Sequence, residues 1–269
     1  NTETSIENHP GNAQTDSGSG EHSVIFEHVD FVYPDGEEAV LKDISFSAKS
    51  GETVAFIGST GSGKSSLIQL IPRFYDRASG NIYIDGQKIE DLDINALRSK
   101  IGFVPQKAHL FSGTIEENIR FGKPDATMDE IIHAAKIAQA YDFIMEKPHQ
   151  FQEQIVEGAT NVSGGQKQRL SIARALIRKP EIYIYDDSFS ALDFKTDARL
   201  RKALKPEIKN AIVFLVAQRV STILDADKIV VLDEGKIAGI GTHRELLASC
   251  PIYYEIAASQ LSKEELTYA

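Results

Sequence analysis

The sequence has a single cysteine and no long apolar segment. One cysteine, Cys250, excludes an internal disulfide framework and a metal site built from cysteines. We expect Cys250 to be a small, buried or half-buried residue. The best apolar run, residues 212–217, has the length of a strand and falls far short of the roughly 20 residues that a membrane span requires. The chain itself is therefore not expected to cross a membrane.

Basic residues are outnumbered by acidic ones. The chain has 29 Lys and Arg against 39 Asp and Glu, which gives a formal net charge of −10. A nucleic-acid-binding surface needs clustered basic residues, so we do not expect nucleic acid as a partner. Hydrophobic residues at 42% and charged residues at 25% are ordinary values for a globular protein and name no function.

Both ends of the sequence differ from its middle. Residues 1–22 are rich in Asn, Gly, Ser, Glu and Thr, so burial cannot offset their ordering entropy, and we predict a flexible linker. The chain begins at Asn1 without a methionine or an apolar signal region, which we interpret as a piece of a longer protein. Residues 23–262 are predicted to form the folded domain, and residues 263–269 a C-terminal tail.

Residues 58–66 read Gly-Ser-Thr-Gly-Ser-Gly-Lys-Ser-Ser, between a predicted strand over 52–57 and a predicted helix starting at 67–71. The glycines let backbone N–H groups turn inward and cradle phosphate oxygens together with the helix N-terminus. Lys64 would place a charge on the β- and γ-phosphates, and the Ser65 hydroxyl would be a ligand for Mg²⁺. A plain Gly/Ser turn is the alternative, but the full G-x-x-x-x-G-K-S spacing in a strand-to-helix setting disfavours it. The predicted phosphate-binding residues are Gly58, Ser59, Thr60, Gly61, Ser62, Gly63, Lys64, Ser65 and Ser66.

The remaining pattern alternates strands and helices. Capping boxes begin at Thr114, Thr127 and Ser163, the second opening a helix to about residue 146 and the third a helix that ends near 178–180. A closing helix starts at Thr242. Strands are predicted over residues 24–33, 40–46, 81–86, 101–106, 181–186, 212–217 and 228–232. The fold class is therefore α/β: a P-loop NTPase (RecA-like) core with an antiparallel β subdomain and an α-helical subdomain inserted at about 112–179.

Two carboxylates and one aromatic ring are further candidates. Asp186 ends an apolar strand and could hold Mg²⁺, while Asp187 could orient a water for in-line attack on a phosphate. The alternative for Asp186 is a solvated aspartate at a strand end. Tyr33 could fill the core or present its ring face to a flat base, and its spacing alone favours core filling.

These motifs resemble those of the ATP-binding cassette (ABC) transporters, specifically the nucleotide-binding domain of exporters. The resemblance covers nearly everything after residue 22. Residues 58–66 match the Walker A loop, 162–169 resemble the family's signature sequence, 188–193 resemble its D-loop, and 110–119 resemble the exporter-type contact region. Glu157 resembles the glutamate of the exporter X-loop, although Gly158 and Ala159 depart from the usual arginine and glycine.

The resemblance implies ATP and Mg²⁺ as cofactors and a second cassette as partner. It implies that Tyr33 stacks on adenine and that Gln106, together with Ser65 and Asp186, serves the metal. In this family two cassettes face head to tail, and each ATP lies between one Walker A loop and the other cassette's signature helix. A helix N-terminus offers N–H groups and a positive dipole end to a phosphate, although an ordinary helix cap is the alternative. The implied signature residues are Ser163, Gly164, Gly165 and Gln166.

Two positions depart from the family pattern. Asp187 stands where members that hydrolyse efficiently have glutamate, and Gln218 stands where they have the switch histidine. Aspartate is one methylene shorter, which sets its carboxylate roughly 1 Å back, and a misplacement of that size can cost on the order of 100-fold in rate. Glutamine cannot become cationic and so loses charge stabilisation of the transition state. We expect ATP binding to survive and hydrolysis to be slow, although either substitution alone could be tolerated drift. We expect no other histidine to take the switch role, and His243 to be a surface or capping residue.

The resemblance then implies one half of a heterodimeric exporter, the half whose own ATP site is degenerate. Such a cassette lies at the cytoplasmic face of the membrane and contacts the membrane only through its own and its partner's transmembrane domains. The implied activity is export of drugs or other amphipathic compounds. The alternatives are a homodimeric exporter cassette with slow but real ATPase activity, a peptide exporter cassette, and a regulatory ATP-binding module that transports nothing.

Overall fold

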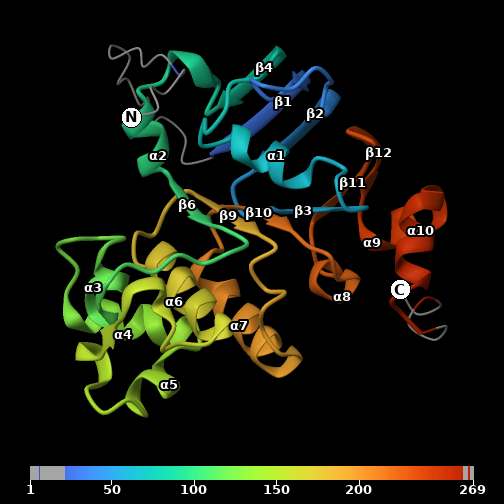
Figure 1. Ribbon diagram of the computed structural model, residues 1–269. Helices are drawn as coiled ribbons and strands as arrows, with labels where there is room; N and C mark the ends of the chain where they lie inside the picture. Colours follow the sequence, from blue (N-terminus) through green and yellow to red (C-terminus); the bar gives the residue numbers. More distant parts are fainter. Residues whose placement is uncertain (1–5, 7–21, 263–265, 267–269) are drawn as a thin grey trace. The chain divides into compact units, whose positions relative to one another are not determined.

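The computed structural model describes Ile6, residues 22–262 and Leu266. The chain divides into two compact units, the first made of residues 1–101 and 210–269 and the second of residues 102–209 (Figure 1). The predicted linker, apart from Ile6 and His22, and the predicted tail, apart from Leu266, lie outside the described residues. Among the helices described, none is long and apolar enough to cross a membrane.

One sheet of the first unit is antiparallel throughout. Its strands follow the order β2-β1-β4-β5. Buried apolar side chains along β1 and β2 are separated by half-buried or exposed ones, as expected of strands that bury one face. The strands are β1 (Ser23–Phe31), β2 (Leu41–Lys49), β4 (Ser79–Ile84) and β5 (Gln87–Lys88). This sheet is the predicted antiparallel β subdomain.

The other strands of the first unit form a mixed arrangement in the order β12-β11-β3-β10. The central strand β3 runs parallel to both β10 and β11, whereas β12 returns antiparallel to β11. All five residues of β10 are buried, which is typical of strands covered on both faces. The strands are β3 (Thr53–Gly58), β10 (Ile212–Val216), β11 (Lys228–Asp233) and β12 (Lys236–Gly241).

Four phenylalanines connect the two sheets of the first unit. Phe26 of β1 stacks on Phe46 of β2, with ring centroids 4.6 Å apart. Phe46 then meets Phe56 of β3 edge-on at 5.5 Å, and Phe56 stacks on Phe214 of β10 at 6.0 Å. Such ring pairs contribute about 0.5–1.5 kcal/mol beyond the burial of their area. The cluster packs against β3, the strand that ends at Gly58, where the phosphate loop begins.

Short helices complete the first unit. The helix after the phosphate loop begins at Lys64, three residues earlier than predicted, so Lys64, Ser65 and Ser66 belong to its first turn. The elements are α1 (Lys64–Leu70), the 3-10 turn η1 (Ile89–Asp91), α2 (Ile94–Ser99), α8 (Val220–Ile223), α9 (His243–Ser249) and α10 (Pro251–Ala258).

Two residues of the C-terminal helices test sequence expectations. Cys250 is buried, as predicted. The surface or capping role expected for His243 is wrong: its ring is buried, and Nδ1 lies 2.6 Å from the hydroxyl of Tyr253. Thr242 is the residue that caps α9, so the sequence pattern located the helix start but not the inward direction of the next side chain.

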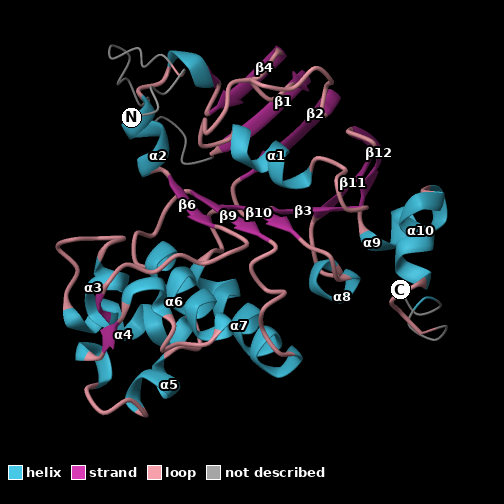
Figure 2. Cartoon of the chain, viewed as in Figure 1, coloured by secondary structure: helices cyan, strands magenta, loops and turns pink. Residues whose placement is uncertain are grey.

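The second unit is mainly helical (Figure 2). Strands β6 and β9 lie side by side, and β7 and β8 form a small antiparallel pair. The strands are β6 (Ile101–Val104), β7 (Gly113–Thr114), β8 (Gln154–Ile155) and β9 (Ile182–Asp186). The helices are α3 (Ile115–Arg120), α4 (Met128–Ile137), α5 (Tyr141–Met145), η2 (Gln150–Gln152), η3 (Glu157–Ala159), α6 (Gly164–Leu176) and α7 (Phe194–Glu207).

The predicted capping boxes at Thr114, Thr127 and Ser163 are confirmed, each with both reciprocal hydrogen bonds. The single helix predicted from Thr127 to about residue 146 is wrong, because the chain forms α4 and α5 instead. Gln139 between them adopts a left-handed backbone, with φ 56°, and the Ala140 amide donates to the Ala135 carbonyl at 2.7 Å. This hydrogen bond is that of a helix-ending Schellman turn, here without glycine.

We predict that Phe56→Ala lowers the free energy of unfolding by about 3–5 kcal/mol, because it opens a cavity in the centre of the four-ring cluster. Chemical denaturation of the full chain measures this change. Phe194→Ala is the control, since Phe194 is 71% exposed, and it should change stability by about 0.5 kcal/mol or less. Equal losses for the two variants would contradict the assignment of the cluster as the core of the first unit.

Candidate functional site

The phosphate loop starts at Gly58, the last residue of β3, where the backbone of the neighbouring strand β11 lies close by. A Cβ placed on Gly58 would lie 2.0 Å from the carbonyl oxygen of Leu232 in β11, so no larger residue fits there. Gly63 has φ 97°, and its Cβ would lie 2.6 Å from Cδ2 of Leu41. Gly61, with φ 83°, faces open space. Positive φ at these positions needs glycine, and the result is a loop whose tip is exposed while its base is packed.

Lys64 lies across the loop that precedes it. Its ammonium donates to the carbonyl oxygens of Gly58 and Ser59 at 2.9 and 2.6 Å, and to Ser62 Oγ at 3.2 Å. The loop therefore places a positive charge at its centre, surrounded by the backbone of residues 58–62. The exposed tip, the open space at Gly61 and this central cation together fit a bound phosphate group.

Tyr33 lies in contact with the helix that begins inside the loop. Its hydroxyl is 2.8 Å from Oγ of Ser66 in α1. Phe31 and Tyr75 meet the Tyr33 ring edge-on, at centroid distances of 4.7 and 5.1 Å. The ring is half-buried, and its role as a base-stacking residue rather than core filling stays a prediction. The structure brings Tyr33 and the phosphate loop together.

Gln218 follows β10 at the same end of the parallel strands as the phosphate loop. The ladder between β10 and β3 continues one residue past β10, since the Ala217 amide donates to the Phe56 carbonyl at 3.1 Å. Gln218 therefore comes level with Ile57 and Gly58, where the loop starts. Its side chain is exposed.

The second unit holds the two aspartates and the Gln106 side chain. Asp186 ends β9, Asp187 follows it, and both are buried, with 5% and 6% exposure. The amide of Gln106 donates to Asp187 Oδ2 at 3.2 Å. Asp187 has a left-handed backbone, with φ 47°, a conformation that aspartate adopts more readily than most residues. The structure therefore brings Gln106 and Asp187 together.

Ser163 caps α6 and leaves the start of this helix exposed. Its hydroxyl accepts from the Gln166 amide at 3.2 Å, and its own amide donates to Oε1 of Gln166 at 3.0 Å. Gly164 faces open space, and a Cβ on Gly165 would lie 3.2 Å from the Ala191 carbonyl oxygen. A 13-residue helix thus presents its positive dipole end and first amides at a surface of the second unit.

Asp193, the last residue of the D-loop-like segment 188–193, caps α7. The hydroxyl and then the amide of Thr196 donate to its carboxylate, and these hydrogen bonds hold the pKa of Asp193 below its usual value. The residue is a helix cap in the described structure.

Three contacts of the candidate residues were missed by sequence reasoning. Tyr75 supports the Tyr33 ring, and buried Gln168 donates to the Pro105 carbonyl at 3.0 Å, which ties α6 to the backbone next to Gln106. Gln260 hydrogen-bonds to the backbone of Gln218. Tyr75 and Gln260 lie outside the motifs, and Gln168 lies within the signature-like residues 162–169. No local pattern indicates the three contacts, because each joins segments far apart in the sequence.

The candidate residues thus form two groups, one in each unit. Lys64, Tyr33, Gln218 and the rest of residues 58–66 belong to the first unit. Gln106, Asp186, Asp187 and residues 163–166 belong to the second. Their roles in nucleotide and metal binding remain predictions.

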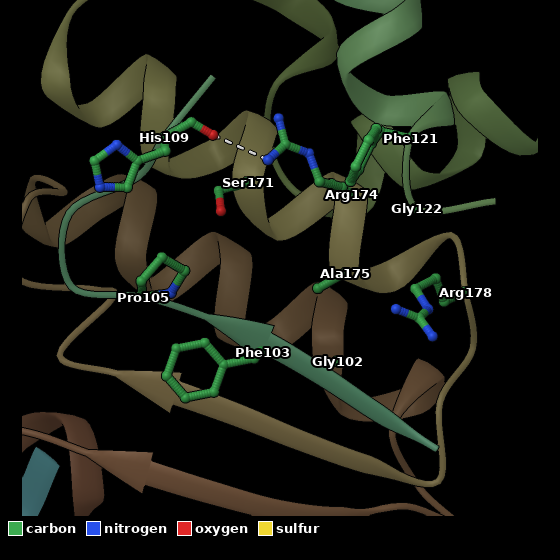
Figure 3. Close-up of a pocket in the computed structure, with 10 residues that line it drawn as sticks. All are labelled: Gly102, Phe103, Pro105, His109, Phe121, Gly122, Ser171, Arg174, Ala175 and Arg178. Carbon is green, nitrogen blue, oxygen red and sulfur yellow. Dashed lines mark hydrogen bonds between the residues drawn. The ribbon is translucent and has the colours of Figure 1, made fainter. Parts of the chain in front are cut away.

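A separate cavity of about 180 Å³ lies in the second unit (Figure 3). Arg174 of α6 forms one of its walls and donates to the carbonyl oxygens of His109 and Asn118 at 2.9 and 2.8 Å. A third bond of 2.9 Å reaches Oδ1 of Asn118, and the guanidinium lies over the rings of Phe111 and Phe121. Burial lowers the pKa of Arg174 to about 10. The network fixes residues 109–121, the segment that contains the predicted exporter-type contact region.

A strand, a glycine-rich loop closed over a lysine, and a helix, set in α/β sheets with a separate helical unit, define a P-loop NTPase fold. A family model described as "ABC transporter" matches residues 41–190. This match covers more than half of the sequence, so the chain belongs to the ABC transporter family. The fold class predicted from the sequence is confirmed.

Known relatives agree with this assignment. "Uncharacterized ABC transporter ATP-binding protein YfiB" of Bacillus subtilis (strain 168) is 47% identical over 241 residues, covering 90% of this chain and 42% of the relative. A "Putative multidrug export ATP-binding/permease protein" of Staphylococcus aureus (strain NCTC 8325) is 49% identical over 237 residues, covering 88% and 41%. The solved "Structure of a bacterial Atm1-family ABC exporter with ATP bound" superposes with a TM-score of 0.87 at 38% identity, covering 90% of this chain and 43% of that one. The chain spans about two fifths of the length of these relatives.

We predict that Arg174→Leu destabilises the protein by about 2–4 kcal/mol, because it leaves partly buried acceptors at His109 and Asn118 without their donor. Thermal and chemical unfolding of the full chain measure the loss. Arg178→Leu is the matched control: Arg178 lines the same cavity but is exposed, and the variant should lose less than about 1 kcal/mol. An Arg174→Leu variant as stable as the control would contradict the structural role of the network.

Proposed function

We propose that this chain is the nucleotide-binding domain of an ABC exporter and that it binds Mg-ATP. The observation that carries the proposal is the phosphate loop, whose central cation is Lys64 and whose first helix is tied to an aromatic ring through Ser66 and Tyr33. An aromatic ring and a phosphate-binding loop within one unit support the binding of a nucleotide. The exporter relatives and the solved exporter structure support the assignment.

The chain's own residues divide the work of binding. Lys64 and the glycine-rich backbone hold the β- and γ-phosphates, and Tyr33 stacks on the base. Ser65, Gln106 and Asp186 provide the hard oxygen ligands that Mg²⁺ prefers. When Mg²⁺ is bound, it neutralises negative charge on the phosphates. Asp187, held by the Gln106 amide, would accept a hydrogen bond from the attacking water.

Hydrolysis at this site is proposed to be slow. The Asp187 carboxylate is one methylene shorter than glutamate, and Gln218 can donate a hydrogen bond to a γ-phosphate but cannot carry a positive charge. Both substitutions weaken stabilisation of the transition state more than ground-state binding. The site would therefore hold ATP for long periods and contribute little turnover, which is what we mean by a degenerate site.

The exposed start of α6 is proposed to act in the site of a second cassette. In a head-to-tail pair, residues 163–166 would offer their amides and the helix dipole to the partner's γ-phosphate. The proposed partner is a different chain with a competent site, so that the pair closes on two ATP molecules and hydrolyses one efficiently.

Exposed Phe111 and Phe121, braced by Arg174, would contact a transmembrane domain at the cytoplasmic face of the membrane. Export of drugs or other amphipathic compounds is the proposed activity of the whole transporter.

A homodimer is the second candidate. The same chain carries both the phosphate loop and the capped start of α6, so two copies have every motif that a closed pair needs. A homodimer in which both ATP sites are complete would hydrolyse ATP measurably and cooperatively. A peptide exporter cassette would share every feature described here, and its cargo would be decided by the transmembrane domains. A regulatory module would bind ATP and close without any transmembrane partner.

We predict that the chain binds Mg-ATP tightly with almost no turnover, alone or at high protein concentration. Lys64→Ala should weaken binding by about 10- to 100-fold, because charge-assisted hydrogen bonds to the phosphates are lost. Titration calorimetry measures the affinity, and phosphate release measures the turnover. Lys88→Ala, which changes an exposed lysine of β5, is the control and should leave the affinity unchanged.

The outcomes separate the candidates. Robust turnover that rises steeply with protein concentration would favour the homodimer over the degenerate half. Absence of Mg-ATP binding in a folded chain would refute the proposed function.

We further predict that Asp187→Glu combined with Gln218→His raises ATP hydrolysis by at least about 10-fold, since the base and the switch cation are both restored. Each single variant should give a smaller gain. Turnover is measured with excess Mg-ATP, and unfolding is followed alongside, because glutamate tolerates the left-handed backbone at position 187 less well than aspartate. Unchanged turnover in a stable double variant would show that these two positions do not limit the rate.

A further inference from the structure

Gln260, just past the end of α10, makes two hydrogen bonds to a segment some 40 residues earlier in the chain. Its Oε1 accepts from the Val220 amide at 2.8 Å, and its Nε2 donates to the Gln218 carbonyl at 2.9 Å. The two bonds use the two ends of one side-chain amide. They therefore hold both sides of the Gln218–Val220 backbone at once.

The first bond satisfies a helix end that lacks its own cap. Helix α8 starts at Val220, and Arg219, in the N-cap position, makes no side-chain capping hydrogen bond. The first amides of any helix have no partner within the helix. Gln260 supplies an acceptor from outside the helix for the first of these amides, whereas a local Ser, Thr or Asp cap accepts from the second or third.

The second bond restrains the backbone of the residue that lies level with the start of the phosphate loop. Gln218 is level with Ile57 and Gly58 through the extended β10–β3 ladder. Its side-chain direction depends on the orientation of its peptide plane, and the Gln260 amide restrains that plane at the carbonyl. Because the contact is to backbone, it acts on whichever side chain occupies position 218.

The element that carries Gln260 is itself anchored. Tyr253 and Ala257 of α10 are fully buried, and His243 of α9 contacts the Tyr253 hydroxyl. The turn that follows α10 is closed by hydrogen bonds from the amides of Gln260 and Leu261 to the Ala257 carbonyl, at 3.0 and 2.8 Å. Gln260 is exposed, yet its backbone is set by a packed helix. The side chain thus transmits the position of α10 to the segment beside the phosphate loop.

We propose that Gln260 is a positioning residue for the switch segment 218–220: it orients the side chain at position 218 toward the γ-phosphate and so sets the rate of the chemical step rather than ATP affinity. The contacts stand by themselves, and the catalytic consequence rests on the proposed function. The C-terminal turn after α10 is then part of the nucleotide site's support.

The first arm of the test is hydrogen exchange of the full 269-residue chain, with and without Gln260→Ala. In Gln260→Ala we expect amide exchange to be at least about five-fold faster than in the unchanged chain, and only within residues 218–223, since the Val220 amide loses its acceptor. Ser259→Ala is the matched control, because Ser259 lies in the same turn and its hydroxyl donates to the Ile256 carbonyl, outside residues 218–223. Unchanged exchange at Val220 in Gln260→Ala would overturn the contact itself.

The second arm measures Mg-ATP hydrolysis in the Asp187→Glu and Gln218→His background, where turnover is expected to be measurable. Adding Gln260→Ala should lower kcat about five-fold and leave KM within two-fold. Gln260→Glu keeps the acceptor for Val220 but turns a carboxylate oxygen toward the Gln218 carbonyl, so it should lose as much kcat as the alanine variant. Full turnover in the glutamate variant would mean that only helix capping matters, and the positioning role would be overturned.

The two arms fail separately. A double variant without increased hydrolysis contradicts the degenerate-site proposal, whereas the exchange experiment then still decides whether Gln260 holds the segment. A fall in kcat and a rise in KM by equal factors, with exchange altered throughout the first unit, would mean general destabilisation and would also overturn the proposal.

Discussion

The parallel pairing of β3 with β10 on one side and β11 on the other is the constraint on which the first unit depends. It brings the Leu232 carbonyl within 2.0 Å of where a Cβ on residue 58 would be, and so makes Gly58 obligatory. It also brings Gln218 level with the start of the phosphate loop. The four-ring cluster of Phe26, Phe46, Phe56 and Phe214 holds this arrangement against the antiparallel sheet. The packing of the four rings therefore helps to set the geometry at the start of the phosphate loop.

The second unit depends on polar contacts to a greater degree. Arg174 and Asn118 satisfy one another and the backbone of residues 109–118, and Gln168 ties α6 to the Pro105 carbonyl. Partly buried networks of this kind are costly to break, because every partner left behind loses its own hydrogen bond. Such a unit resists partial rearrangement. Its exposed helix start at Ser163 and its braced aromatic pair, Phe111 and Phe121, are thereby held as fixed surfaces.

Features encoded by neighbouring residues were predictable from the sequence. The capping boxes at Thr114, Thr127 and Ser163 depend on residues three positions apart, and the strands depend on local alternation or apolar runs. The family resemblance supplied the candidate site positions, which the structure places in two groups.

Features that depend on distant contacts were not predictable. The break at Gln139 has no glycine or proline to announce it, and the helix there ends with a left-handed residue. His243 follows a capping threonine and looks exposed, but Tyr253 draws it inward. Tyr33 resembled a core residue by spacing, whereas its hydroxyl reaches Ser66, and that contact joins residues 33 positions apart. His243 and Tyr33 each bond to a side chain that no local pattern indicates.

The hydrogen bond between Tyr33 and Ser66 has a consequence for the thermodynamics of ligand capture. The Tyr33 ring and the first turn of α1 share a hydrogen bond of 2.8 Å, and Tyr75 packs against the same ring. A ligand that contacts both the Tyr33 ring and the phosphate loop then meets side chains that are already restrained, so less conformational entropy is lost on association. Pre-organisation of this kind makes affinity depend on the fit of the whole ligand rather than on its phosphates alone.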